Sequence, residues 1–158
     1  MTNKPNKRNV NKLIRLLKSI PAHNKKAKRG NKRKFTMNHW NYEQECGTMA
    51  CLGGWTEVIM QKDKVQAPIK NSVDPNCVDP LSIEERAGKY LGLRDYDQML
   101  NMFNMDAIGY CNLRIFDDEY DQDERIEIAV NMLEHFKKTG EVDWEKAINE
   151  HKANWKKG

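Results

Sequence analysis

DQDERIEIAVNMLEHFKKTG, residues 121–140, indicates the fold class most clearly. Asp121 and Glu124 form a capping pattern at its start, and Gly140 is a stop signal at its end. Between them, apolar residues recur at the spacing of a helix that buries one face: Ile126, Ala129, Val130, Leu133 and Phe136. This stretch therefore predicts an amphipathic α-helix that packs against a core.

Five further helices are predicted around this one. Val10, Leu13, Ile14, Leu17 and Ile20 predict a helix that ends at Pro21. The next expected helix is capped by Thr48 and carries Cys51, Leu52, Trp55 and Ile59 on one face. Another begins with the capping box Ser82-Ile83-Glu84-Glu85 and stops at Gly92. The last two are a helix over about 95–104 and a helix capped by Asp143. We therefore expect an all-α or mainly α fold, in a single compact domain of about six helices.

The charge distribution is strongly uneven along the chain. The first 34 residues contain thirteen Lys or Arg and no Asp or Glu, whereas the other 124 contain fourteen basic and twenty-three acidic residues. Such a split costs self-repulsion and is most simply explained by a polyanionic partner. We expect residues 1–9 to form a flexible basic arm, and residues 10–158 to form the helical domain with a mobile basic loop at 22–34.

The basic segment predicts contact with a phosphate backbone, without readout of base sequence. The residues expected to bind DNA or RNA are Lys12, Arg15, Lys25, Lys26, Lys28, Arg29, Lys32, Arg33 and Lys34. A solvated surface that keeps the protein soluble is the plainer alternative, and an acidic protein or an anionic membrane are others. We expect no membrane segment and a cytoplasmic location, because no apolar run approaches the length of about eighteen residues that a span needs.

Two cysteines are weak catalytic candidates. A helix that starts at Thr48 would place Cys46 just before its N-terminus and Cys51 in its first turn, where the helix dipole favours a thiolate. His39 or His135 would then serve as the base. The alternative is that Cys51 packs in the core beside Leu52.

A metal site has little support in the pattern. Cys46 and Cys51 with His39 and a distant Cys77 or Cys111 would supply four ligands, but a second cysteine pair is missing. Residues 117–124 are acidic but do not fit a calcium-binding loop, because Gln122 and Ile128 stand where Gly and Glu are needed. We therefore expect no metal and no cofactor. The acidic stretch is also a candidate to dock the basic loop at 25–34, and His151 is expected at the surface or half-buried.

Three stretches resemble a family of small, uncharacterised proteins of tailed bacteriophages and some bacteria. They are Phe35-Thr36-Met37-Asn38-His39-Trp40 followed by Cys46-Gly47-Thr48-Met49-Ala50-Cys51-Leu52-Gly53-Gly54-Trp55, then Ala87-Gly88-Lys89-Tyr90-Leu91-Gly92-Leu93, then Leu133-Glu134-His135-Phe136 with Gly140-Glu141-Val142-Asp143-Trp144. The resemblance implies a viral origin and a host cell cytoplasm, and it brings no activity with it.

The expected function is therefore non-enzymatic binding of DNA or RNA during infection. One alternative is an interaction protein that engages a host enzyme or defence factor through an apolar groove near Gly53-Gly54. The other is a hydrolase or transferase that depends on Cys46 or Cys51.

Overall fold

The computed structural model describes residues 2–28, 31–35, 42–44, 47–63, 80–104 and 119–157. Six helices lie in this part of the chain: α1 (Lys7–Lys26), α2 (Leu52–Lys62), α3 (Pro80–Leu91), α4 (Tyr96–Asn104), α6 (Gln122–Thr139) and α7 (Trp144–Lys157). Three short strands accompany them: β1 (Arg33–Phe35), β2 (Tyr42–Gln44) and β3 (Gly47–Ala50). The prediction of a mainly helical fold is confirmed.

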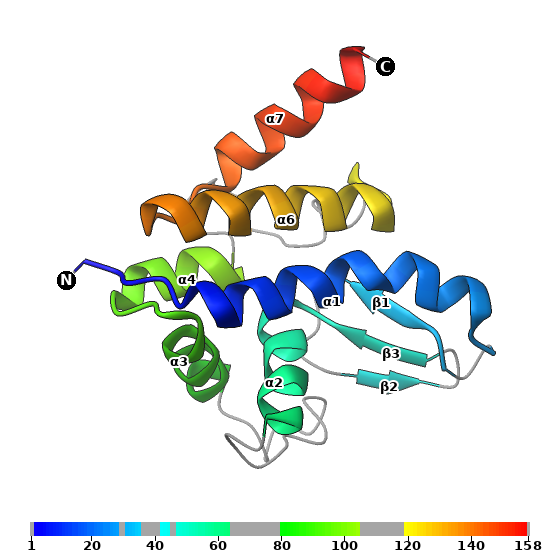
Figure 1. Ribbon diagram of the computed structural model, residues 1–158, viewed down its shortest axis with the longest axis horizontal. Coiled ribbons are helices and arrows are strands. Elements are labelled where there is room, and N and C mark those ends of the chain that lie inside the picture. The colour runs from blue at the N-terminus through cyan, green and yellow to red at the C-terminus, as the bar shows by residue number, and fades with distance from the viewer. Residues whose placement is uncertain are drawn as a thin grey trace.

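Helix α1 lies at the centre of the arrangement (Figure 1). Helix α6 lies along one side of it and carries α7 beyond, while α2, α3 and the small sheet lie on the other side. The apolar face of α1 is buried: Val10, Leu13, Ile14, Leu17 and Ile20. They join one cluster of buried side chains that includes Trp55, Phe136 and Trp144. The α1 helix is thus part of the core as well as the carrier of the basic sequence.

Helix α1 continues past Pro21, so the prediction that Pro21 ends it is wrong. A proline inside a helix typically costs about 3 kcal/mol, because it removes one backbone hydrogen bond and crowds the preceding turn. The turn beyond Pro21 is held by the chain that follows it. Nε2 of His23 lies 2.7 Å from the carbonyl oxygen of Asn31, and the Asn24 side chain bonds the backbone of Arg33.

The N-terminal segment is bound to the body of the protein, unlike the flexible arm that we expected. The Lys4 amide donates to the carbonyl of Gly92 at 3.0 Å, and the Asn3 side-chain amide donates to the carbonyl of Gly140 at 2.9 Å. Asn6 then caps α1 by accepting from the amide of Asn9. Gly92 has φ 94°, and a Cβ there would lie 2.1 Å from the Lys4 carbonyl oxygen. Glycine is therefore needed for this close approach.

The three strands form a sheet in the order β1-β3-β2. Strand β3 pairs parallel with β1, with Arg33 opposite Thr48, and antiparallel with β2. The backbone of residues 47–50 is therefore paired in a sheet, and the prediction of a helix that begins at Thr48 is wrong. Helix α2 begins at Leu52, directly after Cys51.

The remaining helix ends agree more closely with the sequence patterns. Helix α6 has the expected capping box between Asp121 and Glu124, and it ends at Gly140 with φ 78°. Asp143 caps α7 by accepting from the Lys146 amide at 2.9 Å. Helix α3 ends at Gly92 as expected but begins at Pro80, before the expected cap at Ser82. Proline fits the first turn of a helix, since its missing N–H has no partner there anyway.

Candidate nucleic-acid interface

The outward face of α1 carries cations and no acid. Six basic residues of this helix are exposed: Lys7, Arg8, Arg15, Lys18, Lys25 and Lys26. We call this set the α1 stripe. It lies opposite the buried apolar face because helical spacing separates the two sets of residues. No residue of the stripe forms a direct ion pair with a carboxylate among the described residues, although the charge of Arg8 contributes to lowering the pKa of Asp63.

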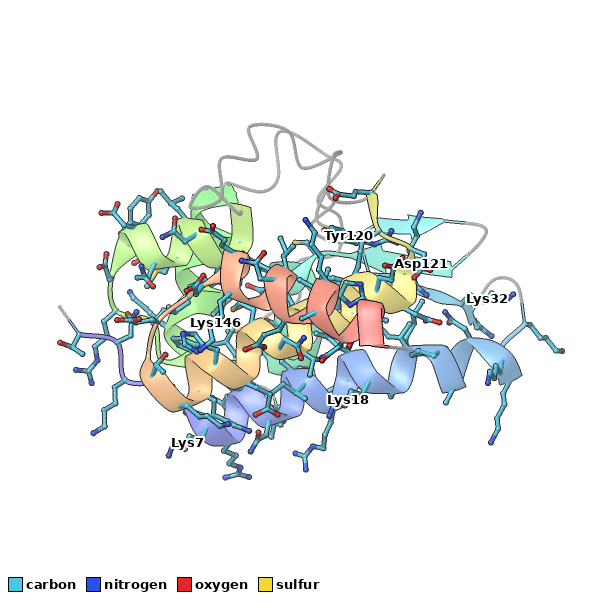
Figure 2. The ribbon with its side chains drawn as sticks, turned by 90° about the horizontal axis from the view of Figure 1, so that it is seen from above. Lys7, Lys18, Lys32, Tyr120, Asp121 and Lys146 are labelled. Atoms are coloured by element: carbon cyan, nitrogen blue, oxygen red, sulfur yellow. The ribbon has the colours of Figure 1, made fainter. Side chains whose placement is uncertain are left out.

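Figure 2 shows where the stripe lies. Helix α1 forms one border of the molecule in this view, and the Lys7 and Lys18 side chains point outward from it. Lys32 lies near the far end of the same helix. The stripe is therefore accessible along the length of α1.

Lys12 belongs to a different environment, although we expected it to bind phosphate. Its Nζ lies 2.5 Å from Oδ2 of Asp63, and the Tyr90 hydroxyl donates to the same oxygen at 2.6 Å. The hydrogen bonds from Lys12 and Tyr90 lower the pKa of the Asp63 carboxyl. Partial burial, reinforced by the neighbouring Asp63 carboxylate, raises the pKa of Tyr90. The Lys12 ammonium group thus pairs with a carboxylate of the protein itself.

The described residues on both sides of positions 29 and 30 are held by hydrogen bonds, whereas we expected a mobile loop at 22–34. Asn24 closes this segment by a pair of hydrogen bonds: its Nδ2 donates to the carbonyl of Arg33, and its Oδ1 accepts from the Arg33 amide, both at 2.7 Å. Lys28, Lys32 and Lys34 are exposed around this closure. Their backbone is held before any ligand binds, which lowers the entropy cost of binding.

Of the expected phosphate contacts, one packs over an aromatic ring and another lies outside the described residues. The Arg33 guanidinium carbon lies 5.9 Å from the centroid of the Trp55 ring, so this half-buried side chain packs over an aromatic face. Arg29 lies outside the described residues. The exposed members of the expected set are therefore Arg15, Lys25, Lys26, Lys28, Lys32 and Lys34.

The stripe also contains residues that sequence reasoning left out of the expected site. Lys7 and Arg8 were assigned to a flexible arm, and Lys18 is not among the residues expected to bind DNA or RNA. The helical spacing from Arg15 to Lys18 and Lys25 was the signal that could have added Lys18. Nothing in the sequence indicated that Lys12 would pair with Asp63, which follows α2.

In the described part of the chain, Asp121 and Glu124 at the start of α6 bond each other's backbone amides in the capping box and form no ion pair with the basic segment. Instead Oε1 of Gln122 accepts from the Phe35 amide at 3.1 Å, and Nε of the buried Arg125 donates to the Phe35 carbonyl. Together with Asn24, these two side chains satisfy the outer edge of β1, which would otherwise offer unpaired backbone groups. Residues 117 and 118 lie outside the described structure.

His151 is buried, contrary to expectation. It is 3% exposed, with Nε2 at 2.9 Å from a Glu124 carboxylate oxygen and Nδ1 at 2.9 Å from a Glu127 carboxylate oxygen. Both ring nitrogens thus face carboxylate oxygens, which accept hydrogen bonds. The cluster fastens α7 to α6 and turns the α6 carboxylates towards α7.

The cysteine candidates gain no catalytic geometry from the described residues. Cys51 is 2% exposed and packs in the core with Leu52 and Trp55, as the structural alternative proposed. His135 is half-buried on α6, with Nδ1 at 3.4 Å from Nζ of Lys146. Cys46, His39, Cys77 and Cys111 lie outside the described residues.

The described residues contain no group of three or more His, Cys, Asp or Glu side chains arranged to hold a metal ion. Among the helices in that part of the chain, none has an apolar stretch long enough to cross a bilayer. Comparison of the whole sequence with protein-family models, with curated proteins and with solved structures finds no significant match. The function is therefore inferred from the residues themselves.

Proposed function

We propose that this protein binds the phosphate backbone of nucleic acid through the α1 stripe and the neighbouring cations Lys28, Lys32 and Lys34. The observation that carries this proposal is the row of exposed cations on one face of a helix without a single acid. Each phosphate that a cation neutralises releases counterions, which gives affinity without base readout.

The internal pairing of the molecule supports the same proposal. The carboxylates of α6 that have a described partner bind within the body, to His151, to Lys137 and to the capping amide of Asp121. None of them forms an ion pair with the α1 stripe. Keeping like charges close together on one helix costs stability, and a polyanionic ligand would offset that cost.

The resemblance to phage proteins supports a role during infection, in the cytoplasm of the host cell. A host protein as the partner remains the second hypothesis, but Gly53 and Gly54 are both buried, so their helix offers no exposed groove at that point. A cysteine-dependent activity has even less support, since Cys51 is enclosed in the core.

A salt titration of binding tests the proposal. We expect labelled DNA or RNA to bind at 50 mM salt. The logarithm of the binding constant should fall with the logarithm of the salt concentration, and this log–log slope should be steeper by about 0.9 for each duplex phosphate contacted. A variant with Arg15, Lys18, Lys25 and Lys26 changed to Gln should bind much more weakly. Its matched control changes Lys62, Lys138, Lys146 and Lys152 to Gln, which removes the same charge from exposed positions elsewhere.

Two results would contradict the proposal. One is equal binding by the two variants, which would show that only net charge matters. The other is an absence of binding to any oligonucleotide at low salt. Salt-tolerant, nuclease-resistant capture of a host protein by both variants would favour the second hypothesis instead.

A further inference from the structure

The α1 stripe consists of two parallel rows of cations. An α-helix turns by about 100° per residue, so positions 7 or 11 residues apart return to nearly the same side. Lys7, Lys18 and Lys25 therefore form one row, and Arg8, Arg15 and Lys26 form the other. The two rows are separated by roughly 60–100° around the helix axis.

Uncharged residues lie between the rows. Asn11 and Ala22 fall on the line that divides them, and Oδ1 of Asn11 accepts from Nζ of Lys137 at 2.9 Å. The α1 side chains between the rows are thus small or neutral, and the Lys137 ammonium group of α6 lies beside Asn11 on the same line. Each row extends over about 27 Å of the helix, at 1.5 Å per residue.

We propose that the ligand of this surface is double-stranded DNA, and that α1 lies along its major groove with each row facing one phosphate strand. This inference rests on the proposed function. The major groove of B-form DNA is about 12 Å wide and admits an α-helix, whose own diameter with side chains is about 10–12 Å. Two flanking rows match two walls of phosphate, whereas a single strand presents only one.

Other features of the surface favour duplex DNA over the alternatives. Proteins that hold single strands usually stack bases on aromatic side chains, but α1 contains no Phe, Tyr or Trp. The one large exposed aromatic residue of the described structure, Tyr96, is on α4. Duplex RNA has a deep and narrow major groove that side chains do not enter, so a half-buried helix would not fit there.

The position of α1 at the border of the molecule makes this placement possible. No described segment lies beyond the helix on the side where Lys7 and Lys18 point (Figure 2). The buried side of α1 is fixed by Val10, Leu13 and Leu17, so the outward face cannot rotate away. The two rows are therefore presented as a rigid pair.

Variants that neutralise one row at a time test the inference. One variant changes Lys7, Lys18 and Lys25 to Gln, the other changes Arg8, Arg15 and Lys26 to Gln, and the control changes Lys138, Lys146 and Lys152 to Gln. Their affinities for a labelled 20-base-pair DNA duplex, the corresponding single strand and the corresponding RNA duplex are measured by fluorescence anisotropy across salt. Circular dichroism establishes that each variant folds.

We expect both row variants to lose roughly tenfold or more in affinity for the DNA duplex at 50 mM salt. Their log–log salt slopes should be shallower by about 0.9 for each lost contact, while the control remains like the unmodified protein. The wild-type protein should also protect guanine N7, which lies on the major-groove edge, from methylation by dimethyl sulfate.

The outcomes separate the inference from the proposed function. If a single strand or an RNA duplex binds as tightly as the DNA duplex, if only one row matters, or if N7 stays reactive, the groove placement is wrong although phosphate binding stands. If none of the three oligonucleotides binds, the proposed function itself fails.

Discussion

Lys12 and Arg15 are both cations of α1, one turn apart, yet their neighbours give them different roles. Lys12 faces Asp63 and Tyr90, and its charge is used inside the protein. Arg15 is exposed and has no carboxylate partner among the described residues. The same contrast separates Arg33, which packs over Trp55, from the exposed Lys34. At this scale the neighbouring residue decides whether a charge is available to a ligand.

Replacing Asp63 by Asn should release Lys12 to the surface. The Asp63→Asn variant removes the carboxylate beside the Lys12 ammonium group, so we expect somewhat tighter binding of nucleic acid at low salt. If Lys12 then reaches a phosphate, the log–log salt slope becomes steeper by about 0.9. Asp97→Asn makes the same charge change at an exposed position of α4 and should leave that slope unaltered. Identical slopes for both variants would show that Lys12 stays out of reach.

Glu57 should make stability depend on pH in a direction unusual for a carboxyl group. It is 5% exposed, and burial raises its pKa above 4.5 although Nε of Arg86 donates to it at 3.1 Å. A raised pKa means that the folded protein holds this proton more tightly than the unfolded chain. The contribution to stability is therefore complete below pH 4.5 and is lost as pH rises through the pKa of the folded state.

Urea unfolding of the wild type and the Glu57→Gln variant between pH 4 and 8 measures this effect. The free energy of unfolding of the wild type should fall relative to that of the variant as pH rises. Glu85→Gln provides a control of opposite sign, because a hydrogen bond from Lys89 lowers the pKa of Glu85. That pairing stabilises the fold above pH 4.5 and is lost in acid. A wild-type curve parallel to that of Glu57→Gln would contradict the expectation.

At the scale of the element, local patterns predicted the long helices and missed the sheet. The capping box at Asp121 and the stop at Gly140 are signals within one segment, and both are confirmed. Strand β1 has three residues and β3 has four, too few for an alternation of apolar and polar residues to show. Each strand depends on pairing with another segment, as Arg33 pairs with Thr48 and Gln44 with Gly47, and the periodicity of one segment does not reveal such a partner.

For the candidate site, the sequence predicted the segment and most of its exposed face but not its contacts with the rest of the protein. The excess of positive charge identified the segment, and the helical spacing identified most of its exposed face. The closure by Asn24 was missed, because a single polar residue near a predicted loop carries no signal of its partner. The role of Lys12 was missed for the same reason, since Asp63 follows a different helix.

Asn24→Ala tests whether the segment after α1 is held by that one side chain. The change removes both hydrogen bonds to the Arg33 backbone, and we expect a loss of about 1–2 kcal/mol in the free energy of unfolding. Amide hydrogen exchange at Arg33 should become faster, because its N–H loses its acceptor. Nucleic-acid affinity should also fall through the loosened Lys32 and Lys34. Ser19→Ala, at an exposed position of the same helix, is the matched control, and equal exchange at Arg33 in both variants would rule out the closure.

At the scale of the whole molecule, α1 performs two tasks on opposite faces. Its apolar face joins the core between α6 and the layer that contains α2 (Figure 1), while its basic face forms a border of the structure (Figure 2). The segment before it is tied to the ends of α3 and α6 through Lys4 and Asn3. The basic N-terminal segment is therefore part of the fold. Deleting it to remove its charge would also remove part of the core.

Deletion of residues 1–34 should unfold the protein. The deletion removes five buried side chains of α1: Val10, Leu13, Ile14, Leu17 and Ile20. Burying such residues contributes about 1.5–3 kcal/mol each, so the loss approaches about 10 kcal/mol, comparable to the whole stability of a typical domain. We expect the truncated chain to show no cooperative thermal transition by circular dichroism. The full chain with Arg15, Lys18, Lys25 and Lys26 changed to Gln keeps every buried residue and should retain a cooperative transition. A truncated chain that melts like the wild type would show that α1 is an appendage, and the rigid presentation of its cations would then have no structural basis.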